Sequence, residues 1–123
     1  MAKAKYVLFE MSEDMKMRTY EAVEMAKNTG KVKKGTNEVT KVIERAQAKF
    51  VVLAEDVSPP EILIHIPYLC KEKNIPFAYV PRKKELGYAA GLGVSTGAVA
   101  IVNPGKARVL LEELSNNVKN LIK

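Results

Sequence analysis

The fold is decided by a short basic segment, a glycine and the first turns of an amphipathic helix, all within residues 31–41. This stretch reads Lys31-Val32-Lys33-Lys34-Gly35-Thr36-Asn37-Glu38-Val39-Thr40-Lys41. The lysine-rich lead-in has the character of a strand, and Gly35 supplies a hinge before the helix. Thr36 is a candidate N-cap, because its hydroxyl can accept a hydrogen bond from an unpaired amide of the first turn. The pattern therefore predicts a strand, a hinge and a helix in succession.

The helix after Gly35 has one apolar face and one polar face. Its apolar residues recur at the spacing i, i+3, i+4, i+7 of a buried helical stripe, and they are Val39, Val42, Ile43 and Ala46. The outward residues are Asn37, Glu38, Lys41 and Arg45. We expect a helix from about residue 37 to residue 47, with Asn37, Glu38 and Lys41 in one patch at its positive end.

This patch suits an anion that also presents hydrogen-bonding edges. The lysines of the lead-in lie beside it, and Gly35 lets the backbone approach a partner closely. Nucleic acid has both properties, since its phosphates would meet the lysines and its base edges the polar side chains. The ordinary alternative is that Glu38 complements the helix dipole, Lys41 pairs with nearby acids and the lysine run is a solvated turn.

The composition predicts one globular domain. At 123 residues, with 47% hydrophobic and 28% charged residues, the chain is large enough for a core and is not disordered. Its net charge is +6, and seven basic residues against two acidic ones lie between Lys27 and Lys49, which favours a polyanionic partner. The single Cys70 and the absence of a long apolar run predict a cytoplasmic protein without membrane association.

Helix and strand signals alternate along the rest of the chain. Ser12 begins a predicted helix that Gly30 ends, and the last helix is expected over residues 106–121 with Leu121 on its inner face. Three apolar runs predict buried strands, namely residues 50–54, 75–80 and 98–102. This alternation is typical of a layered α/β sandwich.

Residues 58–73 predict a helix with an interruption. Ser58 is the expected N-cap, Pro59 the first helical residue, and Glu61 the partner that closes a capping box. Pro67 is expected to break or kink this helix. His65, the only histidine, is expected to be a packed or rim residue, because no carboxylate or nucleophile is spaced to work with it.

Residues 81–97 combine a basic helix start with a glycine-rich loop. The short helix predicted over residues 81–90 begins with three cations, Arg82, Lys83 and Lys84. They oppose the helix dipole unless an anion is present, so they form a second candidate anion contact. A dinucleotide fingerprint needs a strand before the loop and a helix after it, and here the order is reversed. Leu92 and Val94 either present an apolar tip to a partner or are tucked inward.

Two adjacent acidic residues are candidates for a catalytic site, so an enzyme is an alternative function. Glu55 and Asp56 follow the first buried strand, where many α/β active sites lie. A structural role is favoured, because neighbouring acids on a strand point to opposite faces and no histidine or cysteine is spaced to join them. The competing function is a small α/β nucleotide-binding enzyme that uses these acids and the loop 91–97. A protein-interaction scaffold is a third.

Four segments closely resemble the kink-turn-binding ribosomal protein family, and most closely its archaeal large-subunit branch. They are residues 30–41, 50–59, 69–76 and 86–91, and the likeness spans nearly the full length. The resemblance implies a three-layer α/β/α sandwich with a mixed central sheet of about four strands. It also implies an RNA-binding protein, not an enzyme, that recognises kink-turns, which are internal bends built on tandem sheared G·A pairs.

The resemblance further implies partners and site residues. The RNAs are rRNA, box C/D and H/ACA guide RNAs and ribonuclease P RNA, with Nop5 and fibrillarin as protein partners at box C/D RNA. The protein would need no cofactor and would be a monomer without RNA. Asn37, Glu38 and Lys41 match the positions that contact the sheared pairs, and Lys33, Lys34, Gly35 and Thr36 match those that contact phosphates. Ile62, Leu92 and Val94 match the apolar surface over a flipped-out nucleotide, with either Leu92 or Val94 as its main contact, and Lys83 matches a further backbone contact.

Overall fold

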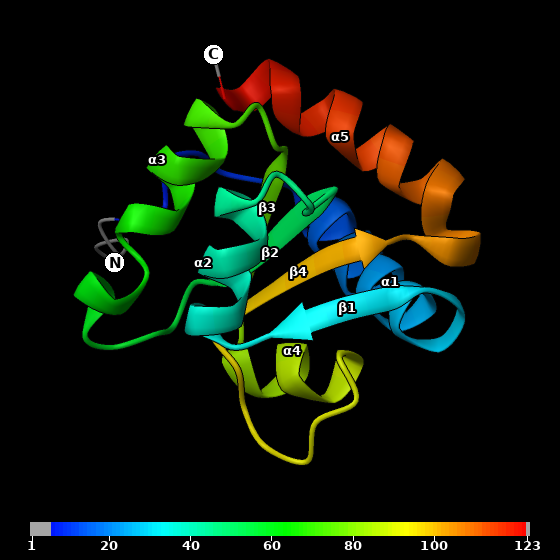
Figure 1. The fold of residues 1–123 in the computed structure, drawn as a ribbon, viewed down its shortest axis with the longest axis horizontal. Coiled ribbons are helices and arrows are strands. Elements are labelled where there is room, and N and C mark those ends of the chain that lie inside the picture. The colour runs from blue at the N-terminus through cyan, green and yellow to red at the C-terminus, as the bar shows by residue number, and fades with distance from the viewer. Residues whose placement is uncertain (1–5, 123) are drawn as a thin grey trace.

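The computed structural model describes residues 6–122, in which helices surround a four-stranded sheet (Figure 1). The α-helices are α1 (Glu13–Thr29), α2 (Thr36–Glu44), α3 (His65–Glu72), α4 (Lys83–Ala89) and α5 (Arg108–Ile122). The strands are β1 (Lys31–Lys34), β2 (Phe50–Ala54), β3 (Phe77–Val80) and β4 (Ala98–Asn103). Two short 3-10 helices are η1 (Pro60–Ile62) and η2 (Gly105–Ala107).

The sheet is mixed, as expected. Its strand order is β1-β4-β2-β3, with β2 and β3 parallel and the other two pairs antiparallel. Every residue of β2 and β3 is buried, which agrees with the continuous apolar runs of the sequence. Because β4 runs opposite to β2, Ala98 begins β4 beside Leu53 near the end of β2. The loop before β4 therefore meets the carboxyl ends of the parallel strands.

Helices cover both faces of the sheet. In Figure 1, α2 lies in front of the strands and α1 behind them, and both helices contact β1 and β4. The helices α4 and α5 pack with α1, while α3 packs with α2. The predicted three-layer α/β/α sandwich is confirmed. The first helix also begins and ends as predicted, because the Ser12 hydroxyl accepts a 3.2 Å hydrogen bond from the Met15 amide and Gly30 follows its last turn.

Two predictions about α2 are wrong. Thr36 is the first helical residue and not the N-cap, because Gly35 takes that position and no side chain caps the helix. The helix ends at Glu44, three residues earlier than expected, so Ala46 is exposed and lies outside it. Ala46 has a φ of 57°, and the Gln47 amide donates a 2.8 Å bond back to the Val42 carbonyl. The chain turns here because it must enter β2 at Phe50.

The prediction for residues 58–73 is also corrected. Pro59 and not Ser58 is the N-cap residue of η1, and no side chain caps that turn, so the expected capping box is absent from this described segment. The longer helix, α3, starts only at His65. Pro67 lies in its first turn, where an amide has no partner within the helix, so Pro67 does not break it.

The last helix follows its predicted stripe except at the end. Leu111, Leu114 and Val118 are buried, but Leu121 is 39% exposed and the prediction that it faces inward is wrong. Leu121 lies in the last turn of α5, one residue before the helix ends at Ile122. The strand predicted over residues 75–80 is shorter than expected, since β3 begins at Phe77 after the Ile75 amide has turned back to the Cys70 carbonyl at 2.9 Å.

Candidate nucleic-acid interface

The start of α2 presents free backbone amides. Gly35 donates a 3.0 Å hydrogen bond from its amide to the Ala98 carbonyl, and its own carbonyl accepts a 2.9 Å bond from Val39. No side chain among the described residues caps the helix, and the amides of Thr36, Asn37 and Glu38 have no acceptor within the helix. Together with the helix dipole, these groups form a site of positive potential.

Gly35 itself leaves this site open. Its φ of 91° and ψ of 148° lie in a region that is essentially restricted to glycine. A Cβ built at this position would meet no atom of residues 6–122 within 4 Å, so this part of the chain leaves the space in front of the backbone free. The requirement for glycine therefore comes from the backbone conformation, and its consequence is an unobstructed approach to the amides.

The polar side chains of α2 lie together next to these amides. Asn37, Glu38 and Lys41 are all exposed, as the helical spacing predicts. The Lys41 ammonium is 3.5 Å from a Glu38 carboxylate oxygen, and the two side chains are 56% and 50% exposed. One part of the ordinary alternative, the pairing of Lys41 with an acid, is therefore present, whereas the lysine run forms strand β1 and not a solvated turn. An exposed ion pair of this length is worth less than about 1 kcal/mol, so both groups can exchange it for other partners.

Two lysines extend the positive surface along β1. Lys33 and Lys34 lie on an edge strand of the sheet and are partly exposed. Within residues 6–122, neither of them forms an ion pair. Their charge therefore adds to that of the open helix end without local compensation.

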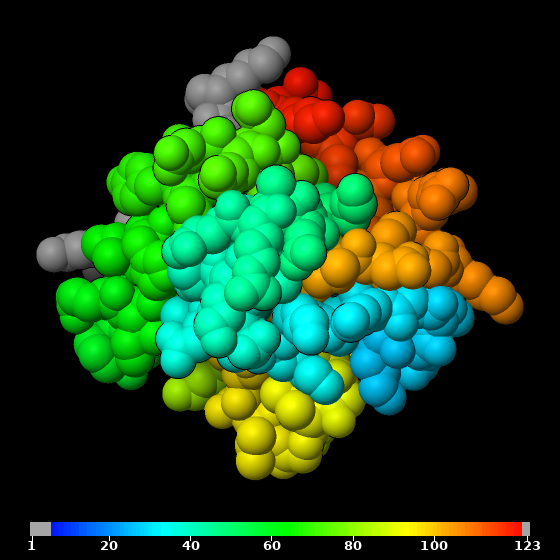
Figure 2. All heavy atoms as spheres, viewed as in Figure 1, coloured from blue at the N-terminus to red at the C-terminus, as the bar shows by residue number. Residues whose placement is uncertain are grey.

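The loop 91–97 and the segment that carries Ile62 meet beside this helix end. Gly97 has no side chain, and a Cβ at this position would lie 2.9 Å from the Val57 side chain and 3.6 Å from the Leu63 side chain. The loop backbone is therefore packed closely against the segment before α3. The Gly97 carbonyl accepts a 3.0 Å bond from the Ala54 amide. In Figure 2 the start of α2 lies between the green segment that contains η1 and the yellow loop.

The apolar side chains of these two segments differ in exposure. Ile62 is 44% exposed and Val94 is 69% exposed, whereas Leu92 is partly buried. Of the two alternatives for this loop, Val94 corresponds to the outward tip and Leu92 to the residue turned partly inward. Exposed aliphatic side chains such as these are suited to covering an apolar or aromatic group of a partner.

The start of α4 is tied to the same loop. The Lys83 amide donates a 2.8 Å bond to the Asp56 carboxylate, and the Lys83 carbonyl accepts a 3.1 Å bond from the Thr96 amide. The Lys83 side chain remains exposed. Glu55 pairs with Lys16 at 3.2 Å. The two acids considered as catalytic candidates therefore have structural roles, one at the start of a helix and one in an ion pair.

Gly87 is a positioning residue that the sequence did not single out. A Cβ at this position would lie 2.1 Å from the Val94 carbonyl oxygen, so the loop backbone lies directly on α4. The Leu92 amide donates a 2.8 Å bond to the Gly87 carbonyl. The available signal was a glycine inside a predicted helix, which often marks a close approach of another backbone. His65 lies at the rim as expected, with its ring nitrogen 3.0 Å from the Thr40 hydroxyl.

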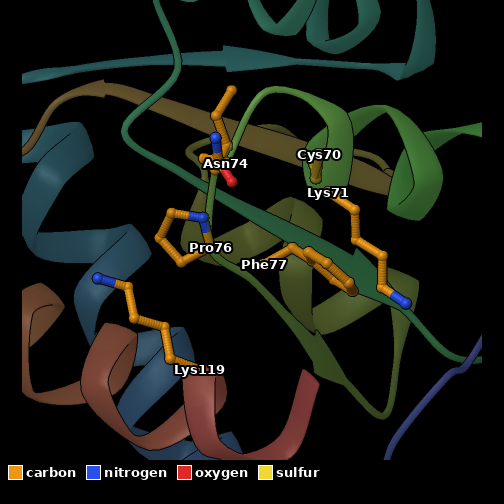
Figure 3. Close-up of a pocket in the computed structure, with 7 residues that line it drawn as sticks. Cys70, Lys71, Asn74, Pro76, Phe77 and Lys119 are labelled. Atoms are coloured by element: carbon orange, nitrogen blue, oxygen red, sulfur yellow. The ribbon is translucent and has the colours of Figure 1, made fainter. Parts of the chain in front are cut away.

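A separate hollow lies between α3 and α5, at the opposite end of the sheet (Figure 3). It has a volume of about 460 Å³ and is lined by Cys70, Lys71, Asn74, Ile75, Pro76, Phe77 and Lys119. Burial raises the pKa of the Cys70 thiol to about 12, so this sulfur is a protonated packing group at neutral pH. In the described part of the chain, no three acidic, histidine or cysteine side chains are grouped to hold a metal ion. No helix among residues 6–122 is long and apolar enough to cross a membrane.

Comparisons with known proteins agree with this fold. The Giardia lamblia 15.5kD RNA binding protein matches with a TM-score of 0.85 and 25% sequence identity, over 94% of this chain and 96% of that one. The profile of the ribosomal protein L7Ae/L30e/S12e/Gadd45 family matches residues 17–111, a range that includes the start of α2, Ile62, Lys83 and the loop 91–97. Since this match covers more than half of the chain, the protein belongs to the ribosomal protein L7Ae/L30e/S12e/Gadd45 family.

Proposed function

We propose that this protein binds kink-turn RNA through the start of α2 and the loop 91–97. The observation that supports this most strongly is the grouping of three features on one surface: open helix amides, lysines that form no ion pair within residues 6–122, and the exposed side chains of Asn37, Glu38 and Lys41. The matched Giardia protein is described as RNA binding, which supports the class of ligand.

The α2 side chains read base edges in this proposal. Glu38 accepts hydrogen bonds from guanine N–H groups, and Lys41 donates to guanine O6 or N7. Their mutual ion pair of 3.5 Å is exchanged for these contacts when RNA binds. Asn37 has both a donor and an acceptor, so it can contact either partner of a sheared G·A pair.

Phosphates are held by the groups around Gly35. Lys33 and Lys34 neutralise charge along the backbone, and the amides of Gly35 and Thr36 mark the point of closest approach. The Gly35 amide already donates to the Ala98 carbonyl, so a phosphate near Gly35 would lie beside that hydrogen bond. The Thr36 amide has no acceptor within the helix and would donate to the phosphate. Lys83 supplies a further backbone contact from α4.

The apolar residues cover the flipped-out nucleotide. Ile62 approaches from η1 and Val94 from the loop, with Leu92 behind it. We assign the main contact to Val94 because it is more exposed than Leu92. Burial of apolar surface against an unstacked base offsets part of the cost of unstacking it.

The mechanism is selection of a bent RNA conformer. A free kink-turn samples extended and kinked forms, and a protein that contacts only the kinked form shifts the population by its differential affinity. Lysines that neutralise crowded phosphates lower the cost of the bend, and Glu38 restricts the fit to the correct base pairs.

The proposed clients are rRNA, box C/D and H/ACA guide RNAs and ribonuclease P RNA, in the cytoplasm. At box C/D RNA the protein would assemble with Nop5 and fibrillarin. Before it meets RNA we expect it to be a monomer without a cofactor. These clients share the same kink-turn element, so one surface is sufficient for all of them.

A gel shift with two RNAs tests the proposal. One RNA contains the kink-turn, and the other is identical except that Watson–Crick pairs replace its G·A pairs. Tight binding to the first and weak, salt-sensitive binding to the second is the expected result. Equal binding to both RNAs would show that the protein binds polyanions in general and does not recognise kink-turns. Binding to neither RNA would contradict the proposal and favour the enzyme or the protein-interaction scaffold.

A further inference from the structure

We propose a second nucleotide-binding subsite on α4, in which the exposed ring of Tyr88 stacks on an unpaired base and Lys84 contacts the phosphate of the same nucleotide. The subsite adjoins Val94, which the proposed interface assigns to the flipped-out nucleotide. It therefore rests on the proposed function and extends it by one nucleotide.

A hollow between α4 and the loop 91–97 carries this inference. Its volume is about 360 Å³, and it is lined by Lys83, Lys84, Tyr88, Gly93, Val94 and Ser95. Small-ligand sites have volumes from roughly 300 Å³ upward, so one nucleotide is a reasonable occupant. The lining combines two ammonium groups with an aromatic ring and an aliphatic side chain. An unpaired nucleotide offers the complementary groups, a phosphate and a flat base.

Tyr88 is available for stacking. Its side chain is 59% exposed, and within residues 6–122 its ring has no aromatic neighbour and its hydroxyl no hydrogen bond. Lys84 precedes it by four residues on α4, so the two side chains project from the same side of the helix. A ring and an ammonium group at this spacing can contact the base and the phosphate of one nucleotide.

The platform is held in place before any ligand binds. The loop backbone lies against α4 at Gly87, the neighbour of Tyr88, where even a Cβ would come within 2.1 Å of the Val94 carbonyl oxygen. At the start of the helix, the Tyr20 hydroxyl accepts a 3.1 Å bond from the Arg82 amide. A ligand that binds here therefore orders few additional groups, which favours affinity.

Charge selects the side of Tyr88 on which the RNA strand runs. Tyr88 also lines another hollow, of about 530 Å³, whose charged lining residues are Glu24, Glu85 and Lys27. Its two carboxylates outnumber its one ammonium group, whereas the charged lining residues of the first hollow are the two lysines Lys83 and Lys84, so phosphates favour the first hollow. The strand therefore passes on the side of the lysines, next to Val94, where the neighbour of the flipped-out nucleotide reaches the ring.

Fluorescent RNA tests this subsite. The base analogue aminopurine is placed at each unpaired position of a kink-turn RNA in turn, and each RNA is titrated with wild-type protein, Tyr88→Ala and Tyr88→Phe. We expect one unpaired position whose fluorescence is quenched by wild-type protein and by Tyr88→Phe but not by Tyr88→Ala. The affinity of Tyr88→Ala for this RNA should fall about 5- to 100-fold, which is the usual range for loss of one base–aromatic stack.

Tyr68→Ala is the matched control. Tyr68 is 58% exposed and also lies on a helix, α3, but it does not line the hollow with the lysines. The Tyr68→Ala variant should show the same quenching and the same RNA affinity as wild-type protein. If wild-type protein discriminates the G·A pairs and Tyr88→Ala matches it at every labelled position, the subsite is absent and the proposed function stands. If wild-type protein does not discriminate the G·A pairs, the proposed function itself fails.

Discussion

The amide of Gly35 donates a 3.0 Å hydrogen bond to the carbonyl of Ala98. This bond joins the start of α2 to the first residue of β4, immediately after the loop 91–97. Two segments more than sixty positions apart in sequence are thereby held side by side. This hydrogen bond therefore holds α2, which we propose reads base edges, next to the loop 91–97, which we propose covers the flipped-out nucleotide.

Replacement of Glu38 by alanine should remove base selectivity. The loss of a carboxylate that accepts from guanine should cost about 1 to 3 kcal/mol of binding to the correct RNA. Binding to the RNA without G·A pairs should not weaken, because Lys41 is released from its 3.5 Å pair with Glu38. Titrations with both RNAs measure the ratio of the two affinities, with and without the G·A pairs. Glu44→Ala, the same change at the other end of α2, is the control, and an unchanged ratio in Glu38→Ala would exclude Glu38 as a base contact.

Replacement of Lys34 by alanine should weaken binding to all RNAs alike. Each phosphate contact adds about one unit to the slope of log affinity against log salt concentration, so the variant should show a slope smaller by about one. Lys49→Ala removes the same charge at the start of β2, at the opposite end of the sheet, and should leave the slope near that of wild type. A slope for Lys34→Ala that equals the wild-type value would show that Lys34 contacts no phosphate.

Replacement of Gly35 by alanine should destabilise the fold without any steric clash. The added Cβ meets open space, but a φ of 91° is strained for any residue with a side chain. The expected loss is about 1 to 3 kcal/mol in the free energy of unfolding, measured by urea titration. Gly93→Ala is matched to it, since its Cβ also meets no atom within 4 Å and its φ is not in the positive range. Equal stability of the two variants would contradict this explanation.

The buried hydroxyl of Tyr79 should make stability fall at high pH. It donates to the Tyr6 carbonyl and accepts a 3.1 Å bond from the Leu8 amide, and burial raises its pKa above the ordinary value of 10.0. The unfolded chain loses this proton near pH 10 while the folded chain retains it, so the stabilisation is complete below pH 10 and is lost as the pH rises further.

Tyr79→Phe provides the comparison for this pH dependence. At pH 7 the variant should be less stable by about 1 to 3 kcal/mol, because buried partners lose their hydrogen bond. Above pH 10 its free energy of unfolding should fall less steeply than that of wild type, by up to about 1.4 kcal/mol per pH unit. Lysine deprotonation affects both proteins and cancels in this difference. Parallel profiles above pH 10 would contradict the role assigned to the hydroxyl.

The failed predictions share a cause in local signals that tertiary structure overrode. Thr36 has a good capping side chain, yet the position goes to Gly35, whose backbone turns to reach Ala98. Ser58 and its prolines form a strong helix start in sequence, but the chain makes only η1 before α3 begins. In both places a long-range contact or a sharp turn decided the boundary, and neither is encoded within one helical turn of sequence.

Only part of the candidate site can be predicted from the sequence. The outward face of α2 follows from helical spacing alone, so Asn37, Glu38 and Lys41 were placed together correctly. The approach of the loop 91–97 to the start of α2 and to the segment before η1 depends on contacts such as Gly35 with Ala98 and Gly97 against Val57, which no local pattern contains. The contact at Gly87 and the role proposed for Tyr88 both depend on the loop 91–97 lying against α4, which no local pattern specifies.

The sequence by itself determined the layers and the inner and outer faces of this protein, because hydrophobic periodicity and unbroken apolar runs are local properties that burial must satisfy. The strand order, the helix boundaries and the joining of α2 to the loop 91–97 were decided by tertiary structure. The physical reason is that a hydrogen bond such as that from Gly35 to Ala98 depends on backbone conformations and packing far apart in the chain. A helix period specifies which side chains point outward, and only the packed fold specifies which neighbours they meet.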